Sequence, residues 1–89
     1  MKKPLDCAIL KLFTKIEEAS PGDVLEMLKS DYGNMRPFTK KGVSDVLMTA
    51  VVNGILEEAH YELDKNDDLI IYYRANEEGR AIINRYLPD

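Results

Sequence analysis

The sequence of this 89-residue chain predicts an α+β fold, with a three-helix core, a two-stranded β-hairpin and a C-terminal helix. Three observations predict that order. Apolar residues recur at helical spacing in three segments before residue 54, and Gly54 then ends the third segment. Two alternating segments follow on either side of an acidic turn, and a last segment returns to helical spacing. A chain of this length has room for one core, so we expect residues 1–89 to form a single domain.

The first two helices are predicted from apolar spacing and from the residues between them. Ser20 suits a helix N-cap, Pro21 suits the first helical position, and Asp23 complements the positive end of the helix dipole. Gly33 and Asn34 are expected to end the second helix. The first helix should span about a dozen residues, with an apolar face made of Leu5, Ala8, Ile9, Leu12, Phe13 and Ile16. The second helix carries the apolar residues Val24, Leu25, Met27 and Leu28.

A loop over residues 33–38 leads into the third predicted helix. Thr39 is a plausible N-cap, and Gly54 ends the helix as a residue in the left-handed conformation would. The buried stripe of this helix is expected to comprise Val43, Val46, Leu47, Ala50 and Val51.

Residues 55–63 and 69–74 are predicted to form a hairpin around the turn at 64–68. A five-residue turn pairs Leu63 with Leu69, Tyr61 with Ile71, Ala59 with Tyr73, and Glu58 with Arg74. We expect the first two pairs on the buried face. Glu58 and Arg74 should form an ion pair on the outer face, beside His60 and Tyr72. Such a pair would partly neutralise Arg74 and make it a poor phosphate contact.

The last helix, over about 77–87, carries more apolar surface than one face of a small domain requires. Self-association through this helix and the first is one reading, and capping of the core is the other. The expected homodimer contacts are Ile82, Ile83, Tyr86 and Leu87.

Helix, glycine stop, hairpin and helix form the second half of a winged helix-turn-helix, and the local sequence resembles the PadR-type regulators in four segments. Asp23–Leu28 lies where that family has its second helix, and Lys41–Leu47 resembles its glycine-led recognition helix. Asn53–Glu57 matches the glycine at the helix end and the apolar strand start. Tyr72–Arg80 is similar to the signature that closes the wing, with Asn76, also a good cap, in place of threonine. MarR-type regulators share much of this pattern.

The resemblance implies a dimeric transcriptional regulator that binds double-stranded DNA. In such proteins the third helix meets the major groove, and here residues 34–54 carry a local charge of +2. We expect the DNA contacts to be Arg36, Thr39, Lys40, Lys41, Ser44, Asp45, Met48 and, on the wing, Lys65. The alternatives are an ordinary solvated helix face, or a protein–protein interaction module, for which an exposed Met48 and an exposed Val52 would be suited.

The charge distribution is compatible with a protein–protein interaction module. The formal net charge is −4 and the pI is about 5.0, which argues weakly against a strong nucleic-acid binder. Residues 55–68 contain six acidic residues against Lys65, a local charge of −5. A winged helix with an acidic wing could therefore face a basic protein partner.

Other classes of function are not favoured by the sequence. A single cysteine, Cys7, excludes an internal disulfide and fits a cytoplasmic protein, and no apolar run is long enough to span a membrane. We expect no enzyme and no cofactor, because a phosphate loop, a zinc-protease motif and paired cysteines are all missing. His60 is expected to be an exposed strand residue that binds no metal. The three aspartates at 64, 67 and 68 fit a solvated turn better than a calcium loop.

Overall fold

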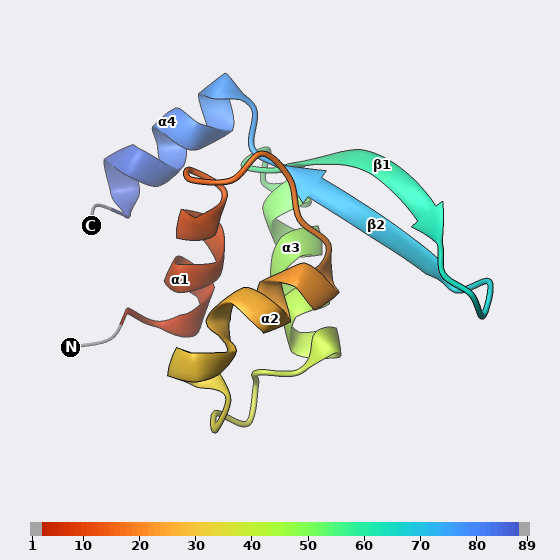
Figure 1. Ribbon diagram of the computed structural model, residues 1–89. Coiled ribbons are helices and arrows are strands. Elements are labelled where there is room, and N and C mark those ends of the chain that lie inside the picture. The colour runs from red at the N-terminus through yellow and green to blue at the C-terminus, as the bar shows by residue number, and fades with distance from the viewer. Residues whose placement is uncertain (1–2, 88–89) are drawn as a thin grey trace.

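The computed structural model describes residues 3–87, which form four helices and one two-stranded antiparallel sheet. The elements in chain order are α1 (Leu5–Leu12), α2 (Pro21–Tyr32), α3 (Lys40–Val52), β1 (Glu57–Leu63), β2 (Leu69–Arg74) and α4 (Glu77–Tyr86). Figure 1 shows α1, α2 and α3 gathered as a helical body, α4 lying next to α1, and the hairpin extending from one side. This is the expected α+β winged helix. Residues 1–2 and 88–89 of the expected domain lie outside the described part.

Side-chain caps start three of the helices where the sequence predicts them. Ser20 Oγ accepts a hydrogen bond from the Asp23 N–H at 3.2 Å, and the Asp23 carboxylate accepts one from the Ser20 N–H at 3.0 Å. Thr39 and Asn76 cap α3 and α4 in the same way, each accepting from the N–H three residues on. Gly54 follows α3 with a φ of 77°, so the predicted left-handed stop is confirmed.

Helix α1 is shorter than its apolar pattern predicts. It ends at Leu12, and the next amides, including those of Phe13 and Thr14, bond to the carbonyl three residues back. In tight turns of this kind, side chains three residues apart lie on nearly the same side of the chain. Phe13 is therefore fully buried although it lies beyond the helix.

The core also holds a lysine that the sequence pattern did not single out. Lys11 is 7% exposed, and its ammonium group donates a hydrogen bond to Asn84 Oδ1 at 3.0 Å. Because Asn84 lies on α4, this bond joins the first and last helices. The apolar core around it consists of Leu5, Ala8, Ile9, Phe13, Ala19, Val24, Leu28, Tyr32, Val43, Leu47, Ala50, Leu56, Tyr73, Ala75 and Ile83.

Near its tip, the wing has the expected register but not the expected burial. Leu63 pairs with Leu69, and Tyr61 with Ile71. The expectation that both pairs are buried is wrong: Leu63, Leu69 and Tyr61 are 64%, 59% and 57% exposed, and only Ile71 is half-buried. The hairpin extends past the helical body (Figure 1), so no described element covers this face near the tip.

Near its base, the wing contains a β-bulge. Strand β1 has an extra residue at Ala59, so Glu58 pairs with Tyr73 and Glu57 with Arg74. The expected pairings of Ala59 with Tyr73 and of Glu58 with Arg74 are therefore wrong by one residue. Arg74 Nε instead donates to the Glu57 carboxylate at 2.7 Å.

Candidate nucleic-acid interface

The N-terminal half of α3 presents polar and basic side chains to solvent. Its opposite side is held in the core by Val43 and Leu47, both fully buried. The macrodipole adds partial positive charge where the two lysines begin the helix. Of the residues expected to contact DNA through this helix and its preceding loop, Ser44 is half-buried, and the exposed ones are Arg36, Thr39, Lys40, Lys41, Asp45 and Met48.

The start of α3 is fixed against the loop before it. Thr39 Oγ1 accepts a hydrogen bond from the Gly42 N–H at 3.0 Å, so this hydroxyl serves as a cap. A Cβ at Gly42 would lie 2.3 Å from the Pro37 carbonyl oxygen, closer than real Cβ contacts come. Glycine at this position therefore allows the loop carrying Arg36 to pack directly on the first turn of the helix.

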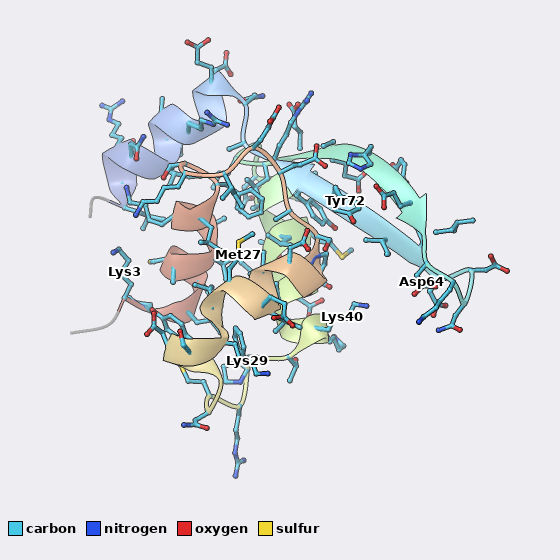
Figure 2. All side chains as sticks on the ribbon, in the orientation of Figure 1. Lys3, Met27, Lys29, Lys40, Asp64 and Tyr72 are labelled. Atoms are coloured by element: carbon cyan, nitrogen blue, oxygen red, sulfur yellow. The ribbon has the colours of Figure 1, made fainter. Side chains whose placement is uncertain are left out.

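One acidic side chain of α3 forms an ion pair with one of its lysines. Lys41 Nζ lies 3.0 Å from the Asp45 carboxylate, one turn further along, and both side chains are largely exposed. An anion approaching Lys41 would have to displace the Asp45 carboxylate, which repels it. Within residues 3–87, Lys40 has no comparable acidic partner, and it lies on the side of the body from which the wing extends (Figure 2).

The remaining predicted DNA contact, Lys65, lies in the tight turn at the tip of the wing. Asp64 organises this turn, because its carboxylate accepts hydrogen bonds from the N–H groups of Asn66 at 2.8 Å and Asp68 at 3.0 Å. Asp67 takes a φ of 62°. Figure 2 shows Asp64 at the far end of the wing from the helical body. The structure thus separates Lys65 from the basic side chains of α3.

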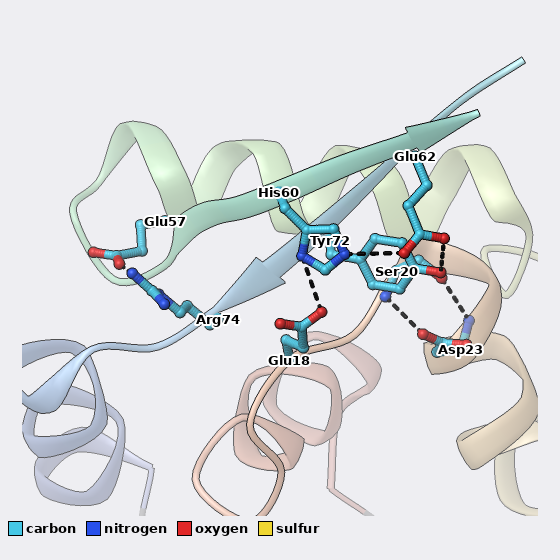
Figure 3. Close-up of polar contacts among 8 residues, drawn as sticks. All are labelled: Glu18, Ser20, Asp23, Glu57, His60, Glu62, Tyr72 and Arg74. Carbon is cyan, nitrogen blue, oxygen red and sulfur yellow. Dashed lines mark hydrogen bonds and ion pairs between the residues drawn. The ribbon is translucent and has the colours of Figure 1, made fainter.

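A polar network covers one face of the wing (Figure 3). The His60 ring lies between two carboxylates, with Nδ1 3.1 Å from Glu18 and Nε2 3.2 Å from Glu62. The ring also stacks on Tyr72, with centroids 4.5 Å apart and planes 6° apart. His60 is thus an extensively contacted strand residue that ties the wing to the α1–α2 connection. Within residues 3–87 no group of three or more His, Cys, Asp or Glu side chains could hold a metal ion.

At the base of the same face, Arg74 is paired with an acidic side chain. Its guanidinium and the Asn76 amide both donate to the Glu57 carboxylate, at 2.7 and 2.9 Å. These two hydrogen bonds, the one from Arg74 foremost, lower the pKa of Glu57 below its ordinary value of 4.5. The partner differs from the expected Glu58. The expected consequence remains, since an arginine paired in this way is a poor phosphate contact.

The opposite face of the wing is apolar and borders a groove of about 210 Å³ beside α3. Sequence analysis did not identify this groove, because its walls come from three separate elements. The apolar residues that alternate in 69–73 are the sequence signal for this groove, but the sequence analysis places them on a buried face. The groove is lined by residues of the α2 start, α3 and β2: Ser20, Pro21, Gly22, Lys40, Ser44, Met48, Leu69, Ile70, Ile71 and Tyr73.

The predicted dimer contacts on α4 divide into two groups. Ile83 is 1% exposed and belongs to the core, so its expected place on an exposed surface is wrong. Leu87 is half-buried against the core. Ile82 and Tyr86 are 37% and 69% exposed, and the Arg85 guanidinium lies 5.6 Å from the centre of the Tyr86 ring. Only Ile82 and Tyr86 are thus free to extend an apolar surface outward.

These features define a winged helix with a solvent-facing third helix. Among solved structures, the fold is similar to that of Bacillus subtilis PadR in complex with operator DNA, with a TM-score of 0.73 and 19% identity. That match covers 96% of this chain and 47% of PadR, so the chain spans about half the length of that protein. A PadR-like transcriptional regulator from Bacillus cereus strain ATCC 14579 matches with a TM-score of 0.64 and 13% identity, over 91% of this chain and 75% of that one.

The fold is therefore a PadR-like winged helix, as the sequence resemblance implied. No protein-family model matches the chain, and no sequence among curated proteins matches it. Across residues 3–87 the structure contains no helix with the length and apolar character needed to cross a membrane.

Proposed function

We propose that residues 1–89 act as one winged-helix domain that binds double-stranded DNA and regulates transcription in the cytoplasm. The observation that carries this proposal is the exposed basic start of α3, in a fold similar to that of a regulator solved on its operator. Fold similarity alone does not determine function, so DNA binding by this domain must come from what the side chains of α3 can contact.

Within this proposal the α3 side chains have different roles. Arg36, Lys40 and Lys41 contact phosphates, which contributes affinity for any sequence. Ser44 and Asp45 read base edges, and Asp45 can accept a hydrogen bond only from a donor such as cytosine N4. Thr39, already engaged as the helix cap, positions the lysines. Met48 offers an apolar contact, and Lys65 adds one positive charge at the wing tip.

The main prediction concerns the dependence of DNA affinity on salt. With about three phosphates neutralised per subunit, the slope of log K against log salt should be about −3 for each subunit, and so about −5 to −6 for the dimer proposed below, which is shallow for a DNA-binding protein. Replacing Lys41 by glutamate should weaken binding to every duplex. Ser44→Ala should instead change the preference among sequences. Fluorescence anisotropy at several salt concentrations measures both effects, with pooled labelled duplexes for the first and with individual labelled duplexes for the second.

Lys15→Glu is the matched control for that experiment. Lys15 is exposed beyond the end of α1, and its replacement makes the same change in net charge away from α3. Equal weakening by Lys15→Glu and Lys41→Glu would mean that net charge alone governs binding. No retention of any duplex at low salt by the folded protein would contradict the proposal.

We further propose that the DNA-binding form is a homodimer joined through α4. Two-fold operators require two recognition helices about 34 Å apart, which one copy of this domain cannot supply. Ile82 and Tyr86 lie on the exposed side of α4 and provide the apolar contact, with Ile83 and Leu87 supporting them from beneath.

Sedimentation equilibrium at micromolar concentration should show a dimer, and the Tyr86→Asp variant should sediment as a monomer with an unchanged helical spectrum. Met27→Asp provides the control, because Met27 is 46% exposed on α2 and should not affect association. A wild-type protein that remains monomeric at all concentrations, with and without DNA, would rule out this arrangement.

A further inference from the structure

The outer edge of β2 is only partly occupied. At its base, Ala19 forms an antiparallel bridge to Tyr73, with N–O distances of 3.0 and 2.9 Å. Backbone groups of successive strand residues point alternately to the two sides. Since Tyr73 bonds outward to Ala19, Ile71 and Leu69 must also direct their N–H and C=O groups outward. Among residues 3–87, no other segment forms a backbone hydrogen bond with this pair.

The two faces beside this open edge differ in character. On the α3 side, Leu69, Ile71 and the 56% exposed Met48 line the 210 Å³ groove. Further along that face, Tyr61 and Leu63 are also more than half exposed. A side chain placed on this side of an added strand would therefore meet apolar atoms. Nothing in the described part of the chain covers them.

On the other side the environment is acidic. Tyr72 lies among Glu62, Asp23 and Glu18, with its hydroxyl 3.4 Å from Glu62. Partial burial first, and then these carboxylates, raise the pKa of Tyr72 above its ordinary value of 10.0. His60 contacts two of the three carboxylates. A side chain placed on this face would therefore be favoured if it carried positive charge.

Charge also discriminates among possible occupants. Residues 57–74 contain six acidic residues against Lys65 and Arg74, and Arg74 is already paired with Glu57. A second copy docked by the same edge would bring two acidic wings together, and a DNA backbone would bring phosphates to carboxylates. Both are unfavourable at short range. A basic polypeptide is complementary.

We propose that the outer edge of β2, from Leu69 to Ile71, binds an extended segment of a partner protein in which apolar and basic residues alternate. The segment continues the strand that Ala19 begins. Its main chain bonds to the open N–H and C=O groups, its apolar side chains enter the groove beside Met48, and its basic side chains face Glu18 and Glu62. This is strand addition, in which the backbone supplies affinity and the alternate side chains supply specificity.

This peptide site does not depend on the proposed DNA binding, but it lies next to the proposed DNA contacts. Lys40 and Ser44, proposed above as DNA contacts, also line the groove. A segment bound there would occupy space next to both side chains, and so would compete with a duplex on α3. The partner segment would then act as a regulator of DNA binding.

The test uses a blocked synthetic octapeptide of alternating valine and lysine, and a control peptide with glutamate in place of lysine. In ¹⁵N-resolved NMR spectra of the whole chain, the lysine peptide should shift the Leu69 and Ile71 amides most and slow their hydrogen exchange. The glutamate peptide should cause no saturable change. No saturable binding by either peptide, or equal binding by both, would overturn the proposal. So would shifts of these two amides caused by duplex DNA and not by the lysine peptide.

Two proline variants locate the edge that is used. Leu69→Pro removes an outward N–H at the first residue of β2 and leaves the bonds to β1 in place, so it should weaken peptide binding by about tenfold or more. Leu63→Pro is the mirror control: Leu63 pairs with Leu69 and has similar exposure, but its N–H points to the outer edge of β1. The affinity of the Leu63→Pro variant for the peptide should stay within about twofold of that of the unsubstituted chain. The reverse order of effects would place the segment on β1 and overturn the assignment, whether or not the chain binds DNA.

Discussion

Replacing Leu47 with alanine is expected to lower the free energy of unfolding by about 2–5 kcal/mol. Leu47 is fully buried at the centre of α3 and faces the core shared with α1 and α2. The substitution removes buried methyl groups and leaves a cavity that rigid neighbouring elements cannot fill completely. Since small domains are stable by only about 5–15 kcal/mol, this loss would unfold a large fraction of a marginally stable protein.

Denaturant unfolding followed by circular dichroism measures this difference. Val52→Ala is the matched control on the same helix, because Val52 is 85% exposed; its effect should stay within about 0.5 kcal/mol. A Leu47→Ala variant that loses no more than the Val52→Ala variant would mean that the core does not hold α3. The proposed DNA contacts would then have no fixed position, since the direction of the basic side chains depends on how α3 is anchored.

The starts of α2, α3 and α4 and the end of α3 were predictable because their signals are local. Ser20, Thr39 and Asn76 each accept a hydrogen bond from the otherwise free N–H three residues on, so each cap depends only on neighbouring residues. The helix end at Gly54 was equally predictable, since a positive φ favours glycine regardless of the rest of the fold. These local signals were sufficient to define the winged-helix order of elements.

The wing was only partly predictable, because burial and register depend on tertiary contacts. Alternation in the sequence shows that Tyr61 and Leu63 share a face, but it does not show whether anything covers that face. The bulge at Ala59 has no distinctive residue, so pairing counted from the turn was correct at Tyr61 and failed at Glu58. Both the apolar groove and the acidic face of the wing follow from this tertiary arrangement.

Long-range contacts account for the other differences. Lys11 appears as a solvated position in the helical pattern, yet Asn84, 73 residues later, offers it a hydrogen bond at 3.0 Å. Ile83 was assigned to a dimer surface, because the pattern of α4 alone does not distinguish residues that face the core from those that face a partner. The exposed basic face of α3 was predictable, since the buried stripe of that helix is clear from its spacing.

Gly79→Ala should destabilise the protein by about 1–3 kcal/mol or more, although alanine is the better helix former. Gly79 is buried in the first turn of α4, where an added Cβ would lie 2.0 Å from the Ile55 carbonyl oxygen. That oxygen belongs to the backbone, so α4 itself must move away from the segment joining α3 to β1. Such a shift would disturb the buried contacts of Ile83 and the hydrogen bond between Lys11 and Asn84.

Gly22→Ala separates packing from helix propensity in the same measurement. Gly22 lies in the first turn of α2, and its added Cβ would meet only Ser20 Oγ, at an ordinary 3.8 Å. That variant should be unchanged or more stable by up to about 1 kcal/mol, because alanine favours the helix and restricts the unfolded chain. Opposite signs for the two substitutions in denaturant unfolding would establish the close approach of α4 to Ile55. If both variants are stabilised, α4 does not pack against that carbonyl, and the placement of the C-terminal helix and its proposed dimer surface must be revised.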